Sequence, residues 1–250
     1  MTQLCLLTLV AALSLCSVLP AEDSDAPSCY LIGNSLTNDT VPSLLDGDVQ
    51  WHIDCGKSLP FIFQNPAEPC VKTSALWPDA LEQTSYDFVS VQVHYGSTLA
   101  EDLDVISQWI ELQPKAVFIV HSGWARAESQ AAEYAATTSA GPMVHSPAYL
   151  EAVLTKLRER YPARTFRQTH AQDLLARIAA DITVGKGPFN NLKDLYRDDI
   201  HLDVVTGRYL MHNAMRHALG QPRSAAGFEK ITPTVKIYLD SVLDTLTEEK

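Results

Sequence analysis

Basic residues are scarce in this 250-residue sequence, and they are scattered along it. Nineteen Lys and Arg residues stand against 30 Asp and Glu residues, which gives a formal net charge of −11 at pH 7. Such a chain repels a phosphate backbone or an anionic membrane unless a local basic patch attracts it. Lys156, Arg158 and Arg160 form no such patch, because their spacing is typical of the solvated face of a helix. We therefore expect no nucleic-acid partner.

The sequence also lacks the short spacings that hold two metal ligands on one local element. It contains no Cys-x-x-Cys and no His-x-x-x-His pattern. A zinc site remains a rival interpretation, because the chain holds enough potential ligands. These are His94, His121, His145, His170, His201, Asp198 and Asp199. We predict neither a metal nor a cofactor.

Long apolar runs are missing after the first 20 residues. Leu4 to Leu19 is almost wholly apolar, and an acidic stretch follows it from Glu22. The length of this run suits a signal peptide better than a membrane span. We predict a signal peptide over residues 1–21, a secreted or periplasmic product, and no stable membrane insertion after cleavage. No Lys or Arg precedes the run, so an uncleaved anchor is the alternative.

Cysteine is rare, and removal of residues 1–21 would leave only Cys29, Cys55 and Cys70. Export makes a disulfide permissible. A bond between Cys55 and Cys70 would close a short loop rich in proline, and we favour this pair. Three buried, unpaired thiols are the alternative.

The remaining composition is globular, with 46% apolar and 20% charged residues. From residue 28 to residue 250, the length suits a single domain. Short apolar runs alternate with helical patterns, which is typical of a parallel sheet between helices. The expected strands are Cys29 to Ile32, Val49 to Ile53, Phe88 to Val93, Ala116 to Val120 and Thr165 to Gln168. The expected helices are Val41 to Leu45, Leu99 to Leu112, Pro147 to Arg160, Ala171 to Ile182, Val204 to Leu219 and Thr234 to Thr247.

Two stretches interrupt this alternation. Gly56 to Asp79 is rich in proline, and Trp124 to Ser146 is rich in Ala, Ser and Thr. Long irregular segments of this kind are often lids or binding loops. The second stretch could also contain a helix from Ala127 to Ala136.

The first chemical signal lies where the first strand ends, in Gly33-Asn34-Ser35-Leu36-Thr37. A buried strand runs into a glycine, a serine and then a helix start. This order places Ser35 at the carboxyl end of the sheet, where open α/β folds bind their ligands. The alternative is that Asn34 or Ser35 only caps the next helix.

The second signal is Asp198-Asp199-Ile200-His201, which precedes a helical pattern. The three-residue spacing can bring the Asp198 carboxylate to one ring nitrogen of His201. The other nitrogen is then free to take a proton from a serine. An isolated Asp-x-x-His is otherwise an ordinary surface pair.

Together, these two blocks and the strand alternation between them resemble the SGNH (GDSL-like) hydrolases over most of residues 29–219. The resemblance implies a three-layer α/β/α sandwich of flavodoxin-like plan with about five parallel strands. It also implies that Ser35 is the nucleophile, that Asp198 and His201 are its orienter and base, and that the Ser35 N–H helps to form an oxyanion hole.

The middle blocks of the family are less well matched. Gly56 follows the second strand, where the family's oxyanion glycine would fall. The usual Gly-x-Asn-Asp is absent after the third strand, so Gln92 is our candidate amide donor and His94 is the rival. Four side chains near the sheet edge are candidates for binding substrate. They are His94, Tyr95, His121 and Trp124.

These features predict a secreted serine esterase that removes short acyl groups, acetyl above all, from a carbohydrate or polysaccharide. Export, the aromatic residues near the sheet edge and the lack of a long apolar acyl-binding stripe favour this substrate. A lipid esterase or a thioesterase remains open. The unusual third block also leaves room for a non-catalytic carbohydrate-binding protein that has kept the fold.

Overall fold

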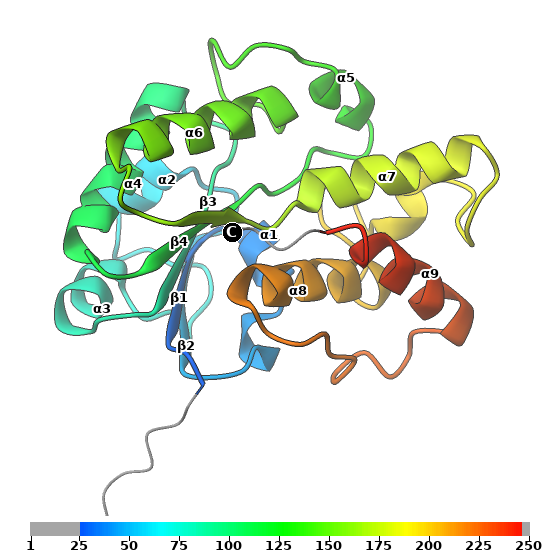
Figure 1. Cartoon of the computed structure of the whole chain (residues 1–250), viewed down its shortest axis with the longest axis horizontal. Coiled ribbons are helices and arrows are strands. Elements are labelled where there is room, and N and C mark those ends of the chain that lie inside the picture. Colours follow the sequence, from blue (N-terminus) through cyan, green and yellow to red (C-terminus); the bar gives the residue numbers. More distant parts are fainter. Residues whose placement is uncertain (1–25, 247–250) are drawn as a thin grey trace, which may run out of the picture.

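A single parallel sheet forms the centre of the molecule in a computed structural model that describes residues 26–246 (Figure 1). The strands are β1 (Cys29–Gly33), β2 (Val49–Ile53), β3 (Phe88–Gln92), β4 (Val117–His121) and β5 (Phe166–Gln168). Within the described range the order is β2-β1-β3-β4-β5, and each neighbouring pair is parallel. This is the flavodoxin-like order, and it confirms the predicted fold class.

Alternation along the strands divides the core between the two faces of the sheet. In β1, Tyr30 and Ile32 join the apolar cluster on one face, whereas Cys29 and Leu31 join the cluster on the other. Successive side chains of a strand point to opposite faces, so a strand with helices on both sides must be apolar throughout. The five residues of β1 are accordingly all buried.

The helices cover both faces (Figure 1). One face carries α2 (Leu59–Gln64), α3 (Trp77–Gln83), α4 (Leu99–Leu112) and α6 (Pro147–Arg160), whose apolar side chains share one cluster. The other carries α1 (Ser35–Asn38), α7 (Ala171–Thr183), α8 (Thr206–Leu219) and α9 (Pro233–Leu243). The short α5 (Gln130–Tyr134) lies in the long segment between β4 and α6. The result is a three-layer α/β/α sandwich.

Two sequence predictions about helices were wrong. The helix expected over Val41 to Leu45 is only a 3-10 turn (Pro42–Leu44), because the Asn34 side chain starts α1 directly after the strand by accepting from Leu36 N–H. The stretch expected to be irregular, Gly56 to Asp79, contains α2 and the start of α3. Each of these helices has a proline in its first turn, where proline favours a helix, so the prolines mark helix starts.

Cys55 and Cys70 form a disulfide, with their Cα atoms 5.6 Å apart, as the sequence favoured. Cys29 is a buried free thiol, and burial followed by the nearby Asp87 charge raises its pKa to about 12. The predicted signal peptide lies outside the described residues. Within residues 26–246, no helix is both long and apolar enough to cross a membrane.

Several histidines of residues 26–246 are buried, and burial is the largest cause of a lowered pKa at each of them. The pKa falls to about 4 at two of them and to about 3 at another two. These buried histidines are His52, His94, His121, His145 and His212. They stay neutral in the folded protein at a pH where an unfolded histidine, with a pKa of about 6.5, takes up a proton.

Acidification should therefore destabilise the fold well above the pH at which its carboxylates titrate. Below about pH 6.5 the unfolded chain binds more protons than the folded one, so the free energy of unfolding should fall between about pH 6.5 and pH 4. Asp102 acts in the opposite direction, because burial raises its pKa to about 7, and it offsets about one of the five histidines. Urea unfolding at a series of pH values measures the slope; a stability that is flat or rises on acidification would contradict this account.

Candidate active site

Ser35 is the first residue of α1, at the carboxyl end of β1. Asn34 holds the turn before it, since its Oδ1 accepts from Leu36 N–H at 2.9 Å and its Nδ2 donates to the Lys57 carbonyl at 3.1 Å. Gly33 is needed for its small size, because a Cβ there would lie 2.1 Å from Thr37 Oγ1. Close packing under the turn therefore presents Ser35 at the edge of the sheet.

Gln92 lies beneath this turn and fastens it. Its Oε1 accepts from the backbone N–H of Asn34 and of Thr37, both at 3.1 Å, and from Thr37 Oγ1 at 3.0 Å. Backbone N–H groups can only donate, so the amide oxygen must face the turn. The amide nitrogen donates to the Val93 carbonyl at 3.2 Å, and the side chain is fully buried. Gln92 thus meets the turn with its acceptor, which is the wrong end of the amide for stabilising an oxyanion.

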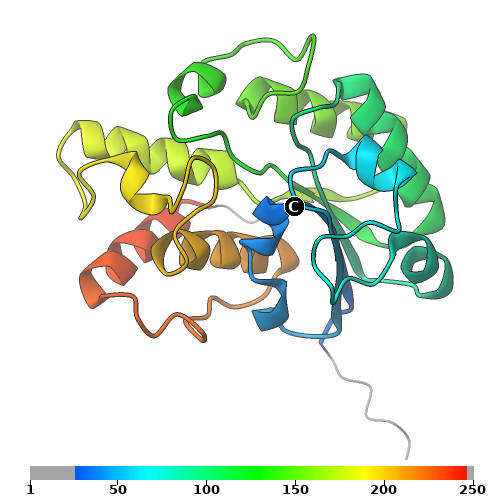
Figure 2. The same cartoon turned by 180° about the vertical axis from the view of Figure 1, so that it is seen from behind.

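The Asp198–His201 segment reaches Ser35 from the other end of the chain. Ser35 Oγ lies 2.8 Å from His201 Nε2, and His201 Nδ1 lies 2.9 Å and 3.0 Å from the two oxygens of Asp198. The carboxylate only accepts, so it fixes the proton on Nδ1 and leaves Nε2 to accept from the serine hydroxyl. In Figure 2, α1 (blue) and the gold segment before α8 lie on the same side of the molecule.

The loop itself keeps Asp198 ionised. Partial burial raises the pKa of this carboxyl, but the backbone N–H groups of His201 and Ile200 lower it, as does the His201 ring, and the net result is a pKa of about 2. Asp198 Oδ1 accepts those two backbone bonds at 2.7 Å and 3.0 Å. The group that orients His201 is therefore a carboxylate at any ordinary pH.

Asp39 ties this loop to the serine helix. It is fully buried and accepts from Arg197 Nη1 at 3.1 Å, from Arg208 Nε at 2.9 Å and from the Leu202 N–H at 3.2 Å. Arg197 also donates to the carbonyl of Leu202. One carboxylate, four residues after Ser35, thereby fixes the chain on both sides of His201.

Trp124 makes a second attachment and is not a sugar platform. Its side chain is fully buried, and its Nε1 donates to the Ile200 carbonyl at 2.6 Å, inside the loop that carries His201. The expectation that Trp124 lines the substrate site is therefore wrong, because its ring is covered by the loop that it supports. His121, which is 1% exposed, is bonded through Nδ1 to Thr169 Oγ1 at 2.8 Å and is likewise internal.

Tyr95 and His94 follow β3 at the same edge. Tyr95 is partly exposed, and its hydroxyl donates to Glu133 Oε1 at 2.8 Å. His94 is 6% exposed and is bonded to His145 at 3.2 Å. Of the four expected substrate-binding residues, these two are in a position to meet a ligand.

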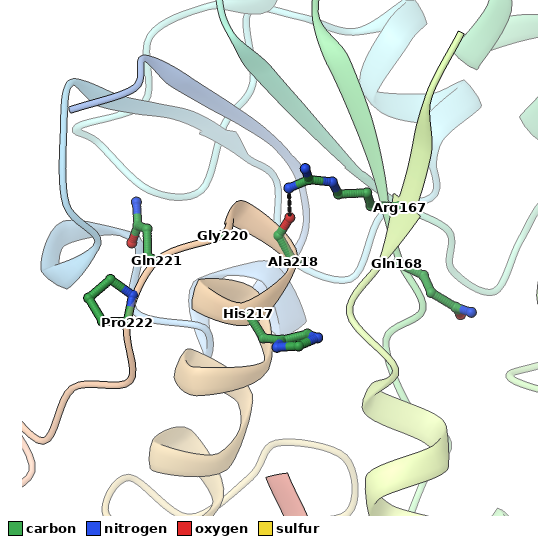
Figure 3. Close-up of a pocket in the computed structure, with 7 residues that line it drawn as sticks. All are labelled: Arg167, Gln168, His217, Ala218, Gly220, Gln221 and Pro222. Carbon is green, nitrogen blue, oxygen red and sulfur yellow. Dashed lines mark hydrogen bonds between the residues drawn. The ribbon is translucent and has the colours of Figure 1, made fainter. Parts of the chain in front are cut away.

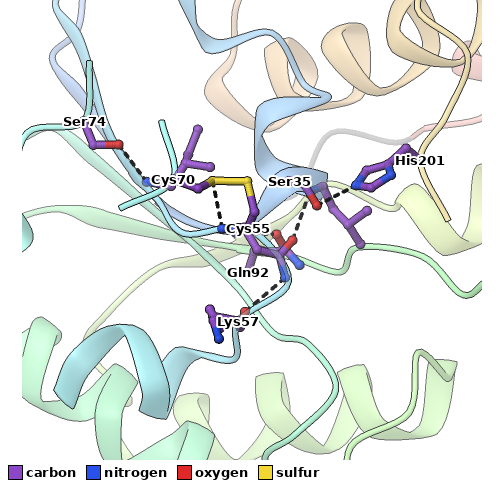
Figure 4. The surroundings of a disulfide bond; sticks show 10 residues. Ser35, Cys55, Lys57, Cys70, Ser74, Gln92 and His201 are labelled. Atoms are coloured by element: carbon purple, nitrogen blue, oxygen red, sulfur yellow. Dashed lines mark hydrogen bonds between the residues drawn. A yellow bond between two sulfur atoms is a disulfide. The ribbon is translucent and has the colours of Figure 1, made fainter. Parts of the chain in front are cut away.

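The backbone N–H groups of Ser35 and of Gly56 have no acceptor among the described residues. Gly56 has a φ of +70°, a conformation that favours glycine, and nothing lies within 4 Å of a Cβ placed there. The disulfide lies beside this turn, as Figure 4 shows together with Ser35 and His201. Cys70 Sγ also accepts from Cys55 N–H at 2.9 Å, which adds a second restraint next to Gly56.

A separate cavity lies elsewhere in the described part of the chain. It measures about 450 Å³ and lies between β5 and the end of α8, lined by Arg167, Ala218 and Gly220 among others (Figure 3). The Arg167 guanidinium packs over Phe88, the first residue of β3, whereas Ser35 follows the last residue of β1. This cavity is therefore separate from the serine–histidine pair. Within residues 26–246, no group of three or more His, Cys, Asp or Glu side chains is placed to hold a metal ion.

Sequence reasoning missed Asp39, Arg208 and Glu133. Asp39 had only its nearness to Ser35 as a signal, and its two arginines are about 160 or more positions away. Glu133 Oε2 accepts from the His145 backbone N–H at 2.8 Å while its Oε1 binds Tyr95. No short sequence pattern predicts the contacts of Asp39 or those of Glu133.

Solved structures with a similar fold include proteins described as a GDSL-like lipase and as carbohydrate esterases. A protein described as a GDSL-like lipase from Parabacteroides merdae is 13% identical, with 78% of this chain and 96% of that chain covered and a TM-score of 0.47. An active-site mutant of a family two carbohydrate esterase from Clostridium thermocellum is 10% identical, with 78% and 65% covered and a TM-score of 0.46. A carbohydrate esterase family 2 enzyme from Corynascus thermopiles is 13% identical, with 60% and 58% covered and a TM-score of 0.36.

No protein-family model and no curated protein matches the chain. Likeness at such low identity concerns the fold alone, and a shared fold does not fix an activity. What the site can do follows from its own residues.

Asp39→Ala should destabilise the protein and detach the histidine loop. Removing the buried carboxylate leaves Arg197 and Arg208 without their shared partner. Loss of one member of a buried ion pair costs about 3–5 kcal/mol, and we expect the lower end because both arginines are partly exposed. Urea unfolding measures this cost.

The matched control is Glu159→Ala, which breaks an exposed pair with Lys156 and should change stability by less than about 1 kcal/mol. If the two variants were equally stable, Asp39 would not be the anchor of the loop.

Proposed function

We propose that this protein is a serine ester hydrolase in which Ser35 is the nucleophile, His201 the general base and Asp198 the carboxylate that orients His201. The observation that carries the proposal is the continuous hydrogen-bonded path from Ser35 Oγ through His201 to Asp198, with contacts of 2.8 Å and 2.9 Å. A surface Asp–His pair would have no reason to end on a serine 166 positions earlier in the chain.

The reaction follows from these contacts. His201 Nε2 takes the Ser35 proton as Oγ attacks the ester carbonyl carbon, and the ionised Asp198 stabilises the imidazolium. The backbone N–H groups of Ser35 and Gly56 donate to the oxyanion. His201 then gives its proton to the leaving alcohol. In the second half, His201 removes a proton from water as the water oxygen attacks the acyl-serine carbonyl. His201 then returns this proton to Ser35 Oγ as the bond from Oγ to the acyl carbon breaks, which releases the acid and regenerates the serine.

The oxyanion hole that we propose has two donors. Gln92 does not contribute, because its oxygen faces the serine turn and its nitrogen serves Val93. Its part is to hold Asn34 and Thr37, and through them Ser35. With this arrangement the oxyanion has two backbone donors although the usual Gly-x-Asn-Asp block is absent.

For the substrate we propose a short acyl ester, acetyl above all, on a carbohydrate or polysaccharide, cleaved outside the cytoplasm. The apolar segment Leu4 to Leu19 supports export. The catalytic groups lie near the surface, since the side chains of His201 and Asp198 are 28% and 49% exposed. An open site of this kind suits an acyl group carried on a large, polar molecule. Lipid esterase and thioesterase activities are the alternatives.

A fluorophosphonate probe should label the protein at Ser35 and fail to label Ser35→Ala. Ser122→Ala is the matched control, because Ser122 is a fully buried serine whose hydroxyl donates to the Gly123 carbonyl, and this variant should label as the wild type does. Mass spectrometry of the labelled peptide identifies the site. An unlabelled, correctly folded wild type would favour a non-catalytic carbohydrate-binding protein.

Initial rates on acetyl, butyryl and long-chain esters test the acyl group. We expect kcat/KM to fall as the chain lengthens and acetylated xylan to release acetate. Each extra methylene changes kcat/KM by about 10-fold or more when a pocket binds or rejects it, so the trend is measurable. Preference for long chains would replace the acetyl proposal by a lipid esterase.

A further inference from the structure

His94 takes no part in the steps described above, yet it lies next to them. It follows β3, which neighbours β1 in the sheet, so His94 and Ser35 sit at the same edge. Its ring packs against Tyr95 and His145, with ring centres 4.9 Å and 5.3 Å away. The ring is almost entirely enclosed, and its hydrogen bonds determine where its one proton lies.

The proton positions on the His94 and His145 rings follow from the hydrogen bond between His145 and the Ser122 carbonyl. His145 Nδ1 lies 3.0 Å from the Ser122 carbonyl oxygen, which can only accept, so His145 must carry its proton on Nδ1. A neutral imidazole has one proton, and His145 Nε2 is therefore an acceptor. His94 Nδ1, 3.2 Å from that Nε2, must be the donor. The proton of a neutral His94 is thus on Nδ1, and its Nε2 carries a lone pair.

Both rings are neutral at working pH. Burial, followed by the neighbouring His145, Arg126 and His201, lowers the pKa of His94 to about 3, and only Glu133 opposes this. Burial also lowers the pKa of His145 to about 3. The alternative arrangement, with a proton on Nε2 of His94, would leave two ring nitrogens facing each other without a hydrogen between them.

Nε2 of His94 is the part of the ring that remains open. It has no hydrogen-bond partner among the described residues, and it is not one of their fully buried unpaired atoms. This atom is therefore the part of the ring that is exposed to solvent. A lone pair here cannot donate to an oxyanion, so His94 is also excluded as the rival oxyanion donor.

We propose that His94 Nε2 is a specificity determinant that accepts a hydrogen bond from a hydroxyl group on the alcohol part of the substrate. This inference rests on the proposed ester hydrolysis and narrows its substrate class to acyl esters of polyhydroxy compounds. A substrate with a free hydroxyl can donate to this fixed acceptor and is bound more tightly in the transition state. A substrate without that hydroxyl leaves the acceptor unpaired. Fatty-acyl esters of simple alcohols and thioesters lack that donor.

The test compares two forms of one ester, a methyl xyloside that carries a single acetyl group and has its other hydroxyls either free or methylated. The variants are His94→Phe, which keeps the ring without its nitrogens, and His94→Gln, which can restore an acceptor. We expect His94→Phe to lower kcat/KM by about 10-fold on the free-hydroxyl ester and by much less on the methylated one. His94→Gln should recover part of the difference.

Equal losses on both esters would overturn the proposal, because His94 would then act through the fold or through the attacking water. A second measurement needs no variant. Nitrogen-15 NMR of the unmodified protein should show His94 and His145 protonated at Nδ1, and a proton on Nε2 of His94 would also overturn it.

Failure of the proposed function gives a different pattern. 4-Nitrophenyl acetate has no hydroxyl on its leaving group and tests the hydrolytic machinery alone. If the wild type cleaved it and the probe labelled Ser35 while the xyloside comparison failed, only the role of His94 would be lost. If neither cleavage nor labelling occurred, the hydrolase assignment would fail and the inference with it.

Discussion

The buried carboxylate of Asp39 is the attachment on which the arrangement of the site depends. Ser35 and His201 are 166 positions apart, and no strand pairing joins their segments. Asp39 lies one helical turn after the serine and binds Arg197, Arg208 and the backbone of Leu202. Because the charge is inside the protein, it must be fully paired, and only one position of the loop satisfies it. The 2.8 Å contact between Ser35 Oγ and His201 Nε2 therefore depends on an ion cluster that lies outside the Ser35–His201–Asp198 path.

The strand-end residues are divided between support and contact with ligand. Gln92 and Trp124 both contact the backbone of the segments that carry Ser35 and His201. Gln92 accepts from the turn before Ser35, and Trp124 donates to the loop that carries His201. Two backbone N–H groups and the Nε2 atom of His94 are left open. The buried amide of Gln92 and the buried indole N–H of Trp124 position these segments, and the open atoms are the ones that we propose to contact a substrate.

The sheet and both ends of the candidate site could be predicted from local patterns. Strand alternation gave the five strands to within about a residue, and Gly33-Asn34-Ser35 and Asp198-x-x-His201 identified the segments that meet. Roles set by distant partners could not be predicted. The sequence predicted Trp124 to bind a ligand, but its indole N–H donates to Ile200. It predicted Gln92 to be an oxyanion donor, but its amide oxygen accepts from Thr37. Which end of an amide faces a turn depends on tertiary packing, and sequence carries no sign of it.

In the hydrolase that we propose, the exposure of the Asp198–His201 pair would affect the fate of the acyl intermediate. A deep pocket would exclude bulk solvent and let a bound alcohol compete for the acyl group. Here the His201 side chain is 28% exposed, so bulk water reaches it directly. In the reaction that we propose, this exposure would favour hydrolysis of the acyl-serine over transfer of the acyl group to a second sugar.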